Sequence, residues 1–127
     1  MKAKEELLYT REHIWLSASQ DSALIGITDF AQKSLGELVF VDLPDVDDVI
    51  LVGETFGTAE SVKTVSDLFM PVDGTVIAVN EEAVQDPEIV NQDAYAAWLL
   101  KIAITDQSQL SELMSAEEYN VFVNGDK

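Results

Sequence analysis

The chain of 127 residues contains no cysteine, a single histidine, and 7 lysine and arginine residues against 24 aspartate and glutamate residues. Without cysteine, neither disulfide bonds nor thiolate metal sites can form, so packing alone must hold the fold together. Such a composition fits a reducing compartment. The formal net charge of -17 repels nucleic acid phosphates and anionic lipid headgroups. We therefore expect neither nucleic acid nor a membrane as a partner.

Long apolar runs are also missing, because no stretch approaches the roughly 18 residues that a membrane-spanning helix needs. At the N-terminus, Lys2 and Lys4 are accompanied by Glu5 and Glu6, unlike a secretory signal or an Arg-rich transit peptide. We therefore expect a cytoplasmic protein. The length predicts one domain over residues 1–127, with a core at about 7–104 and a C-terminal helical segment at 106–122.

Residues that could catalyse a reaction by themselves are scarce. Nucleophilic catalysis needs a nucleophile, a base and an orienting group, and His13 is the only imidazole. Suitable zinc ligands are lacking, and Asp45, Asp47 and Asp48 lack the spacing and turn glycine of a calcium loop, so we expect a solvated turn there. No catalytic and no metal site is predicted. The chain is not expected to be an enzyme, and if it takes part in a reaction, a cofactor must supply the reactive atoms.

Most of the chain shows the pattern of short β-strands separated by turn signals. The run at 37–43 is almost continuously apolar, which suits a central strand buried on both faces. Asp73 and Gly74 form a strong hairpin signal between apolar runs at 68–72 and 75–79. The pattern predicts a mainly β protein, a small β-sandwich or flattened barrel with short helices. Strands are predicted at 7–9, 14–18, 23–27, 37–43, 49–52, 55–59, 68–72, 75–79 and 98–104.

Two short helices are predicted within this β pattern. Asp29 stands three residues before Gln32, much as in a capping box, which predicts a helix at 28–35. Asp86 as the cap and Pro87 at the first helical position predict a second helix, in which Asn91 closes one turn.

Two further helices are predicted at the C-terminus. Asp106 with Gln109 caps a helix at 110–114, and Ser115 with Glu118 forms a capping box for a last helix at 119–122. The C-terminal segment is therefore expected to be helical and to decorate the β fold.

One lysine stands alone in an acidic region. Lys63 is the only basic residue between Ser34 and Leu100, an interval that holds fourteen acidic residues. Residues compatible with β-structure flank it on both sides, which places Lys63 at or near the tip of an exposed hairpin. An exposed lysine is protonated up to a pKa of about 10.4 and is unreactive by itself. Lys63 is therefore either a solvated surface residue or the target of an enzyme that acylates its amine.

The residues around Lys63 resemble the lipoyl attachment segment of the glycine cleavage system H protein family. The likeness lies in Glu60-Ser61-Val62-Lys63, then Ser66-Asp67, then residues 70–74. It extends from about Tyr9 to Tyr119, where further segments stand in the usual order of that family. These segments are Gly26-Ile27-Thr28-Asp29, Ala31-Gln32, Leu35-Gly36, residues 39–44 and Ala78-Val79-Asn80.

The resemblance implies a lipoyl domain of the barrel-sandwich hybrid type, with lipoate bound covalently to Lys63. It implies that Glu60, Ser61 and Val62 form the attachment motif that a lipoyl-attaching enzyme reads. The implied role is a carrier, expected to be a monomer, that takes the aminomethyl group of glycine from a pyridoxal-phosphate decarboxylase to a tetrahydrofolate-dependent aminomethyltransferase. Dihydrolipoamide dehydrogenase would then reoxidise the dithiol. The family also holds its loaded arm in a surface cleft.

Three positions depart from the family pattern. Ile14 replaces a glutamate that is expected near the arm cleft, and Phe30 stands where many members have histidine. The segment 95–98 is one residue shorter than its family counterpart and lacks the family's glycines. These differences bear on how the loaded arm is sheltered, not on its attachment.

Three alternatives stay open. A biotin carrier usually has methionine on both sides of its lysine, whereas Val62 and Thr64 flank Lys63 here. A lipoyl protein could serve another pathway, as a lipoyl donor to 2-oxoacid dehydrogenases or as a carrier in sulfur metabolism. The third alternative is that the chain is an acidic interaction module that carries no modification.

Overall fold

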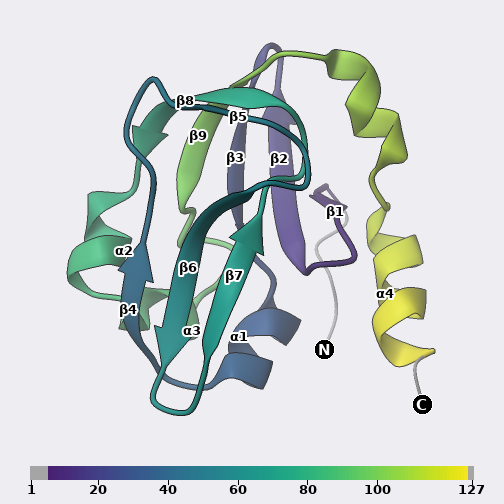
Figure 1. The fold of residues 1–127 in the computed structure, drawn as a ribbon. Helices are drawn as coiled ribbons and strands as arrows, with labels where there is room; N and C mark the ends of the chain where they lie inside the picture. The colour runs from purple at the N-terminus through teal and green to yellow at the C-terminus, as the bar shows by residue number, and fades with distance from the viewer. Residues whose placement is uncertain (1–5, 126–127) are drawn as a thin grey trace.

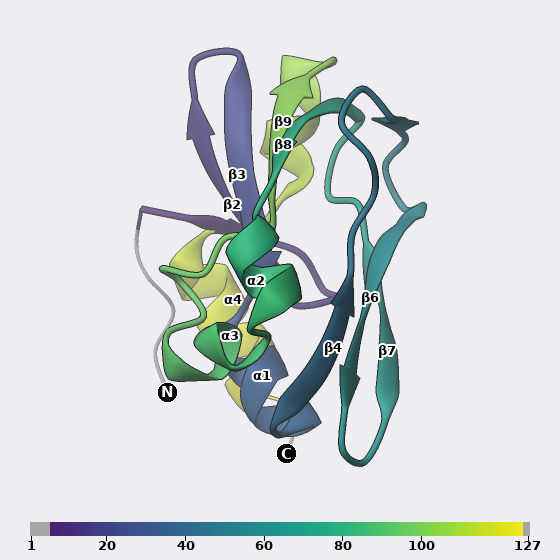
Figure 2. The ribbon, with the colours of Figure 1, turned by 90° about the vertical axis from the view of Figure 1, so that its left-hand side faces the viewer.

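The computed structural model describes residues 6–125 and places two antiparallel sheets face to face, with short helices around them (Figures 1 and 2). Strands of the larger sheet run in the order β1-β2-β3-β9-β8-β5, and those of the smaller sheet in the order β4-β6-β7. Within residues 6–125 neither sheet closes on itself, so the fold is a flattened sandwich. The mainly β fold expected from the sequence is confirmed. Residues 1–5, part of the segment in which we expect no targeting signal, and residues 126–127 lie outside the described residues.

The predicted strands correspond to nine observed ones, several of them shorter than expected. The larger sheet contains β1 (Leu8–Tyr9), β2 (Ile14–Ser19), β3 (Ser22–Ile27), β5 (Val49–Ile50), β8 (Gly74–Val79) and β9 (Leu100–Ile104). The smaller sheet contains β4 (Leu38–Asp42), β6 (Thr55–Ser61) and β7 (Val65–Phe69). The helices are α1 (Asp29–Leu35), α2 (Glu81–Gln85), α3 (Glu88–Gln92), the 3-10 helix η1 (Gln107–Glu112) and α4 (Ala116–Asn124). None of these helices combines the length and apolar character that crossing a membrane requires.

The main core lies between the two sheets. Because side chains alternate along a strand, each sheet turns one set of apolar residues toward the other sheet. Burying an aliphatic side chain of this kind contributes roughly 1.5–3 kcal/mol. The larger sheet supplies Leu16, Ile25 and Ile102 among others, and the smaller sheet supplies Val41, Ala59 and Leu68.

A second apolar cluster lies under α4. Its buried members are Leu7, Tyr9, Trp15, Ala116 and Tyr119. The rings of Tyr9 and Tyr119 stack with their centroids 4.6 Å apart. The predicted capping box of Ser115 and Glu118 is present and starts α4. Figure 1 shows α4, in yellow, alongside β1 and β2.

The run at 37–43 is not the central strand that its apolar composition suggests. β4 is an edge strand of the smaller sheet, and only Leu38 and Val41 of its five residues are buried. Val39 and Phe40 are exposed, and the register with β6 shifts between Leu38 and Phe40. The prediction of burial on both faces is therefore wrong, because no second layer of the described structure covers the outer side of this sheet (Figure 2).

The prediction of a hairpin at Asp73-Gly74 is also wrong. β7 pairs with β6 in the smaller sheet, whereas β8 pairs with β5 and β9 in the larger sheet. The chain therefore crosses from one layer to the other at residues 70–73. The backbone N–H of Asp73 donates to Oε1 of Gln109 at 2.7 Å, and the N–H of Thr105 donates to the Asp73 carbonyl at 3.1 Å. Hydrogen bonds to the C-terminal segment thus hold the crossing.

The caps of the inner helices differ from the prediction in detail. Thr28, not Asp29, is the N-cap of α1, because its Oγ1 accepts a hydrogen bond from the N–H of Ala31. Residues 81–85 form α2, a helix that was not predicted, and Asp86 ends α2 instead of capping α3. Pro87 occupies the N-cap position of α3 without a side-chain hydrogen bond.

Candidate functional site: the Lys63 hairpin

Lys63 lies at the tip of the hairpin that joins β6 and β7, as predicted. The last paired residues are Glu60 and Val65, and the N–H of Ser61 donates to the carbonyl of Thr64 at 2.8 Å. Lys63 is exposed within the three-residue tip 62–64. Figure 1 shows this loop projecting at one end of the smaller sheet. The geometry therefore presents the lysine amine to an approaching protein.

Ser61 organises the turn from inside. Its Oγ accepts hydrogen bonds from the N–H groups of Lys63, at 3.2 Å, and Thr64, at 3.1 Å. The same hydroxyl donates to the Thr64 carbonyl at 3.3 Å. Ser61 is buried, whereas its motif partners Glu60 and Val62 are exposed. The motif thus divides into one residue that shapes the tip and two that an outside partner can contact.

The base of the hairpin is fixed to the segment between α1 and β4. The N–H of Val62 donates to the carbonyl of Glu37 at 3.2 Å. Asn91 of α3 supports that segment, since its Oδ1 accepts from the N–H of Leu38 at 2.9 Å. Its Nδ2 donates to the Gly36 carbonyl and to Oε1 of Gln32, both at 2.9 Å. Asn91 was predicted to close one helical turn, and it lies one residue before the end of α3. Its side chain also links three elements below the tip.

The Lys63 side chain extends along the backbone of Gly36, the C-cap of α1. A Cβ at Gly36 would lie 3.4 Å from Cε and 3.9 Å from Nζ of Lys63. Gly36 has φ of 88°, a conformation that glycine adopts without strain. Within residues 6–125 the observed salt bridge joins Lys33 to Asp29 at 3.7 Å, and Lys63 takes part in none. The amine is therefore free of a carboxylate that would hold it.

A surface pocket of about 520 Å³ adjoins the same glycine. It lies between α1 and α3. Apart from Gly36, its lining residues carry amide or charged side chains. The lining residues are Gln32, Lys33, Gly36, Glu37, Glu88, Asn91 and Gln92.

The positions that depart from the family pattern occupy structural places. Ile14 is almost fully buried in the main core, so it does not line an open cleft as its family counterpart was expected to. Phe30 packs against the ring of His13 with centroids 4.7 Å apart. The shortened 95–98 turn is held by Asp93, whose Oδ1 accepts from the N–H groups of Tyr95 and Ala96, both at 3.2 Å.

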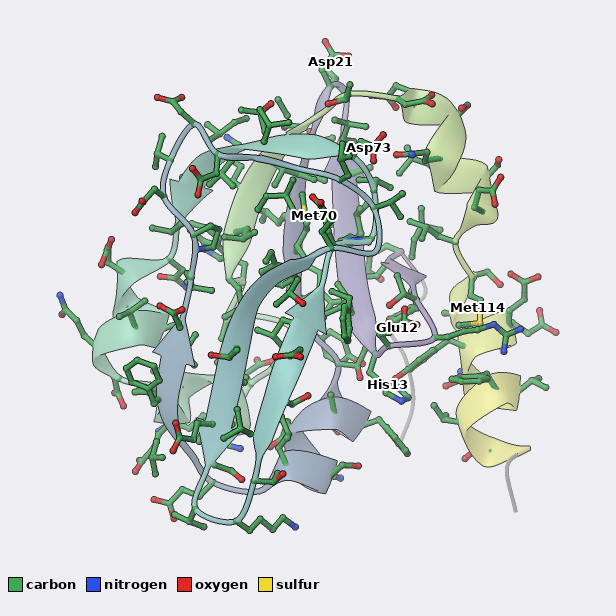
Figure 3. The ribbon with its side chains drawn as sticks, in the orientation of Figure 1. Glu12, His13, Asp21, Met70, Asp73 and Met114 are labelled. Carbon is green, nitrogen blue, oxygen red and sulfur yellow. The ribbon has the colours of Figure 1, made fainter. Side chains whose placement is uncertain are left out.

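Among residues 6–125 no cluster of three His, Asp or Glu side chains could hold a metal ion. Asp45 and Asp48 form an exposed turn in which the N–H of Asp45 donates to Oδ2 of Asp48 at 3.1 Å. Figure 3 shows His13 beside α4, where its Nδ1 is hydrogen-bonded to the hydroxyl of Tyr119 at 2.7 Å. The solvated turn expected at Asp45, Asp47 and Asp48 is confirmed.

A flattened sandwich that presents an exposed lysine at the tip of a β-hairpin has the arrangement of carrier domains that are modified on lysine. The family model of the glycine cleavage H-protein matches residues 7–126 of this chain. The chain therefore belongs to the glycine cleavage H-protein family, which carries lipoate in glycine cleavage.

Individual relatives agree with this assignment over nearly the whole length. The glycine cleavage system H protein of Halothermothrix orenii is 50% identical over 120 residues, which cover 94% of both chains. That of Staphylococcus saprophyticus is 50% identical over 124 residues, covering 97% of this chain and 98% of the relative. The crystal structure of the Mycobacterium marinum H protein superposes with a TM-score of 0.87 at 39% identity, covering 97% of this chain and 99% of that one. The predicted family is confirmed.

Proposed function

We propose that Lys63 carries lipoate through an amide bond and that the chain shuttles the aminomethyl group of glycine between enzymes. The observation that carries the proposal is the exposed Lys63 amine, which has no carboxylate partner within residues 6–125, at the tip of a hairpin held by Ser61 and Asn91. An amine in this position fits an amide-linked group, because its neighbours leave it accessible. Bound lipoate would supply a disulfide that opens as one sulfur accepts the aminomethyl group and the other becomes a thiol, and it would be a dithiol only after that group is passed on.

The chain's own residues position and shelter the attached group. Ser61 holds the tip in one conformation, and Gly36 leaves room for the lysine stem to lie along the protein. This direction supports a loaded arm that folds back onto the surface toward α1. A tether also raises the effective concentration of the attached group at each partner, so transfer needs no free diffusion of the carried group.

The partners in this proposal are glycine decarboxylase, the aminomethyltransferase, dihydrolipoamide dehydrogenase and the lipoyl-attaching enzyme. The net charge of -17 favours basic docking surfaces on these proteins, a steering effect that salt weakens. We place the protein in the cytoplasm, in agreement with its lack of cysteine. In this scheme it is a non-catalytic carrier.

The test is the intact mass of the protein after expression with both lipoate and biotin available, compared with Lys63→Arg. We expect a lipoyl-sized increment that the variant lacks, since a guanidinium preserves the exposed charge but offers no acylable amine. The Arg variant should unfold at the same urea concentration as the wild type. A biotin-sized increment, or none while a control protein is lipoylated, would refute the proposal.

A second measurement separates the glycine pathway from other lipoyl pathways. The lipoylated protein is incubated with glycine and a glycine decarboxylase, and its mass is followed. Gain of an aminomethyl group is the expected result. A lipoylated protein that glycine cannot load would instead serve as a lipoyl donor or as a carrier in another pathway.

A further inference from the structure

The outer face of the smaller sheet presents two large apolar side chains in one row. Phe40 lies opposite Glu60, and Glu60 lies opposite Val65, so the three residues share a face. Phe40 is 51% exposed and Val65 is 60% exposed. Figure 2 shows that no other described element lies beyond this side of β4, β6 and β7. We call Phe40, Glu60 and Val65 the outer row.

Acidic side chains lie within the outer row and along the side of it that faces away from Lys63. Two positions farther along the strands, Asp42 lies opposite Thr58 and Thr58 lies opposite Asp67. Both aspartates are exposed on the same face, as is Glu60 within the row itself. A complementary surface must therefore combine an apolar recess with basic groups at its rim.

The outer row also lies close to Lys63. Val65 follows Lys63 by two residues, so their Cα atoms lie at most about 7 Å apart, the span of two residues in a fully extended strand. β4 and β7 are separated by two strand spacings of about 4.8 Å each, so Phe40 is about 10 Å farther across the sheet. The whole row fits within the footprint of a protein that covers the hairpin tip, since a standard interface buries about 800 Å² on each partner.

One side of the Lys63 stem is occupied by the backbone of Gly36. The N–H of Val62 continues the β4–β6 pairing through its hydrogen bond to the Glu37 carbonyl, so the edge of the hairpin beside β4 is paired as well. A protein that contacts the tip over the outer face meets neither of these segments. The outer face offers apolar contact area, whereas the tip itself offers three residues.

We propose that the outer row is the docking surface for the enzyme that attaches lipoate to Lys63, an inference that rests on the proposed function. The attaching enzyme must bring its active site directly to the lysine amine, so it must cover the hairpin beside the tip. Enzymes that act on the attached lipoyl group contact its distal end, so they can bind farther from Lys63. The recognised features are the Phe40 and Val65 side chains, inserted into an apolar recess with a basic rim.

The experiment measures kcat/KM for attachment by a lipoate-protein ligase supplied with lipoate and ATP. The double variant Phe40→Thr/Val65→Thr places threonine, which favours β-strands, at both positions and removes the apolar contacts. Val65→Lys tests the same surface independently, because a cation there would repel a basic rim. The matched control is Val49→Lys, since Val49 is 69% exposed on the larger sheet. Urea unfolding verifies that every variant folds.

We expect the double variant and Val65→Lys each to lose about tenfold or more in kcat/KM, as truncation of central interface residues does. The loss should reside mainly in KM, and Val49→Lys should stay within about twofold of the wild type. Equal kcat/KM values for attachment in all variants would overturn the inference that the outer row is a docking surface. The proposed function would stand in that case, because the wild type is still lipoylated. Normal attachment combined with slower loading by the decarboxylase would assign the surface to the decarboxylase and equally overturn this inference. Failure of the wild type to accept lipoate would refute the proposed function itself.

Discussion

The hydroxyl of Tyr119 lies 2.7 Å from Nδ1 of His13 and joins the last helix to the loop between β1 and β2. The same hydroxyl lies 2.8 Å from Oγ1 of Thr28, the residue that caps α1. Burial raises the pKa of Tyr119 to about 12, with smaller effects from Thr28 and Tyr95, so the hydroxyl keeps its proton at neutral pH. It can donate to a neutral His13, which then carries its own proton on Nε2.

The partial burial of His13 predicts a specific pH dependence of stability. Burial lowers the pKa of His13 below its usual 6.5, although the charge of Glu12 opposes the shift. The unfolded chain therefore binds a proton more readily, and the stabilisation present above pH 6.5 is lost as the pH falls toward the lowered value. Urea unfolding at pH 7.5 and pH 5 should show this loss. His13→Gln, which takes no proton, should reduce the pH dependence, and an unchanged dependence would contradict the role of His13.

Asn91 is predicted to stabilise the segment on which the lipoyl hairpin rests. Asn91→Ala removes the partners of the Leu38 N–H and the Gly36 carbonyl, which should cost about 1–3 kcal/mol of unfolding free energy. Hydrogen exchange at Val62 should also accelerate, because its N–H is bound to the same segment. The neighbouring exposed residue Gln92, changed to alanine, serves as the control. Equal exchange at Val62 in both variants would show that the hairpin does not depend on Asn91.

Ser61 is predicted to affect attachment more than stability. Ser61→Ala removes the acceptor of the Lys63 and Thr64 N–H groups, so the tip should sample several conformations. We expect the free energy of unfolding to fall by only about 1 kcal/mol, because these N–H groups lie at an exposed tip where water can replace the serine hydroxyl. The kcat/KM of lipoate attachment should fall about three- to tenfold, since the lysine is less well positioned. Ser66→Ala on the adjacent strand is the control. If Ser61→Ala accepted lipoate as fast as Ser66→Ala, Ser61 would not position the lysine.

Gly26 is predicted to be irreplaceable beside Trp15. A Cβ at Gly26 would lie 2.6 Å from the indole, which is itself held by a 3.1 Å hydrogen bond from Nε1 to the Ala94 carbonyl. Gly26→Ala should therefore destabilise the fold by about 1–3 kcal/mol or more, as overpacking does. Urea unfolding measures the cost, with Ser22→Ala on the same strand as the control. A stability equal to the control would mean that the indole can move aside.

Local signals predicted the parts of the site that depend on neighbours in sequence. The β-compatible residues on both sides of Lys63 placed it at a hairpin tip, and the four residues 115–118 contain both halves of their capping box. These features could be read because their geometry needs only a few consecutive residues. The resemblance to a family rested on the same kind of local motif.

Features that depend on distant residues could not be read in this way. Asn91 looked like the end of a helical turn, yet its amide links α3 to α1 and β4, contacts that span more than fifty residues of sequence. The apolar run that contains Phe40 looked buried on both faces, because composition does not show whether a second layer covers a strand. Asp73-Gly74 carries the residues of a tight turn, but the chain there changes sheets.

The sequence by itself therefore determined the mainly β character, the exposed acylable lysine and the exclusion of cysteine chemistry, since these follow from composition, alternation and short motifs. Only the tertiary structure decided which strand lies at an edge, where the chain passes between layers, and what supports the hairpin. The physical reason is that strand pairing and side-chain burial are settled by contacts between segments far apart in the chain. Those contacts turn one exposed lysine into a positioned site, with Gly36 on its inner side and Phe40 on the outer face.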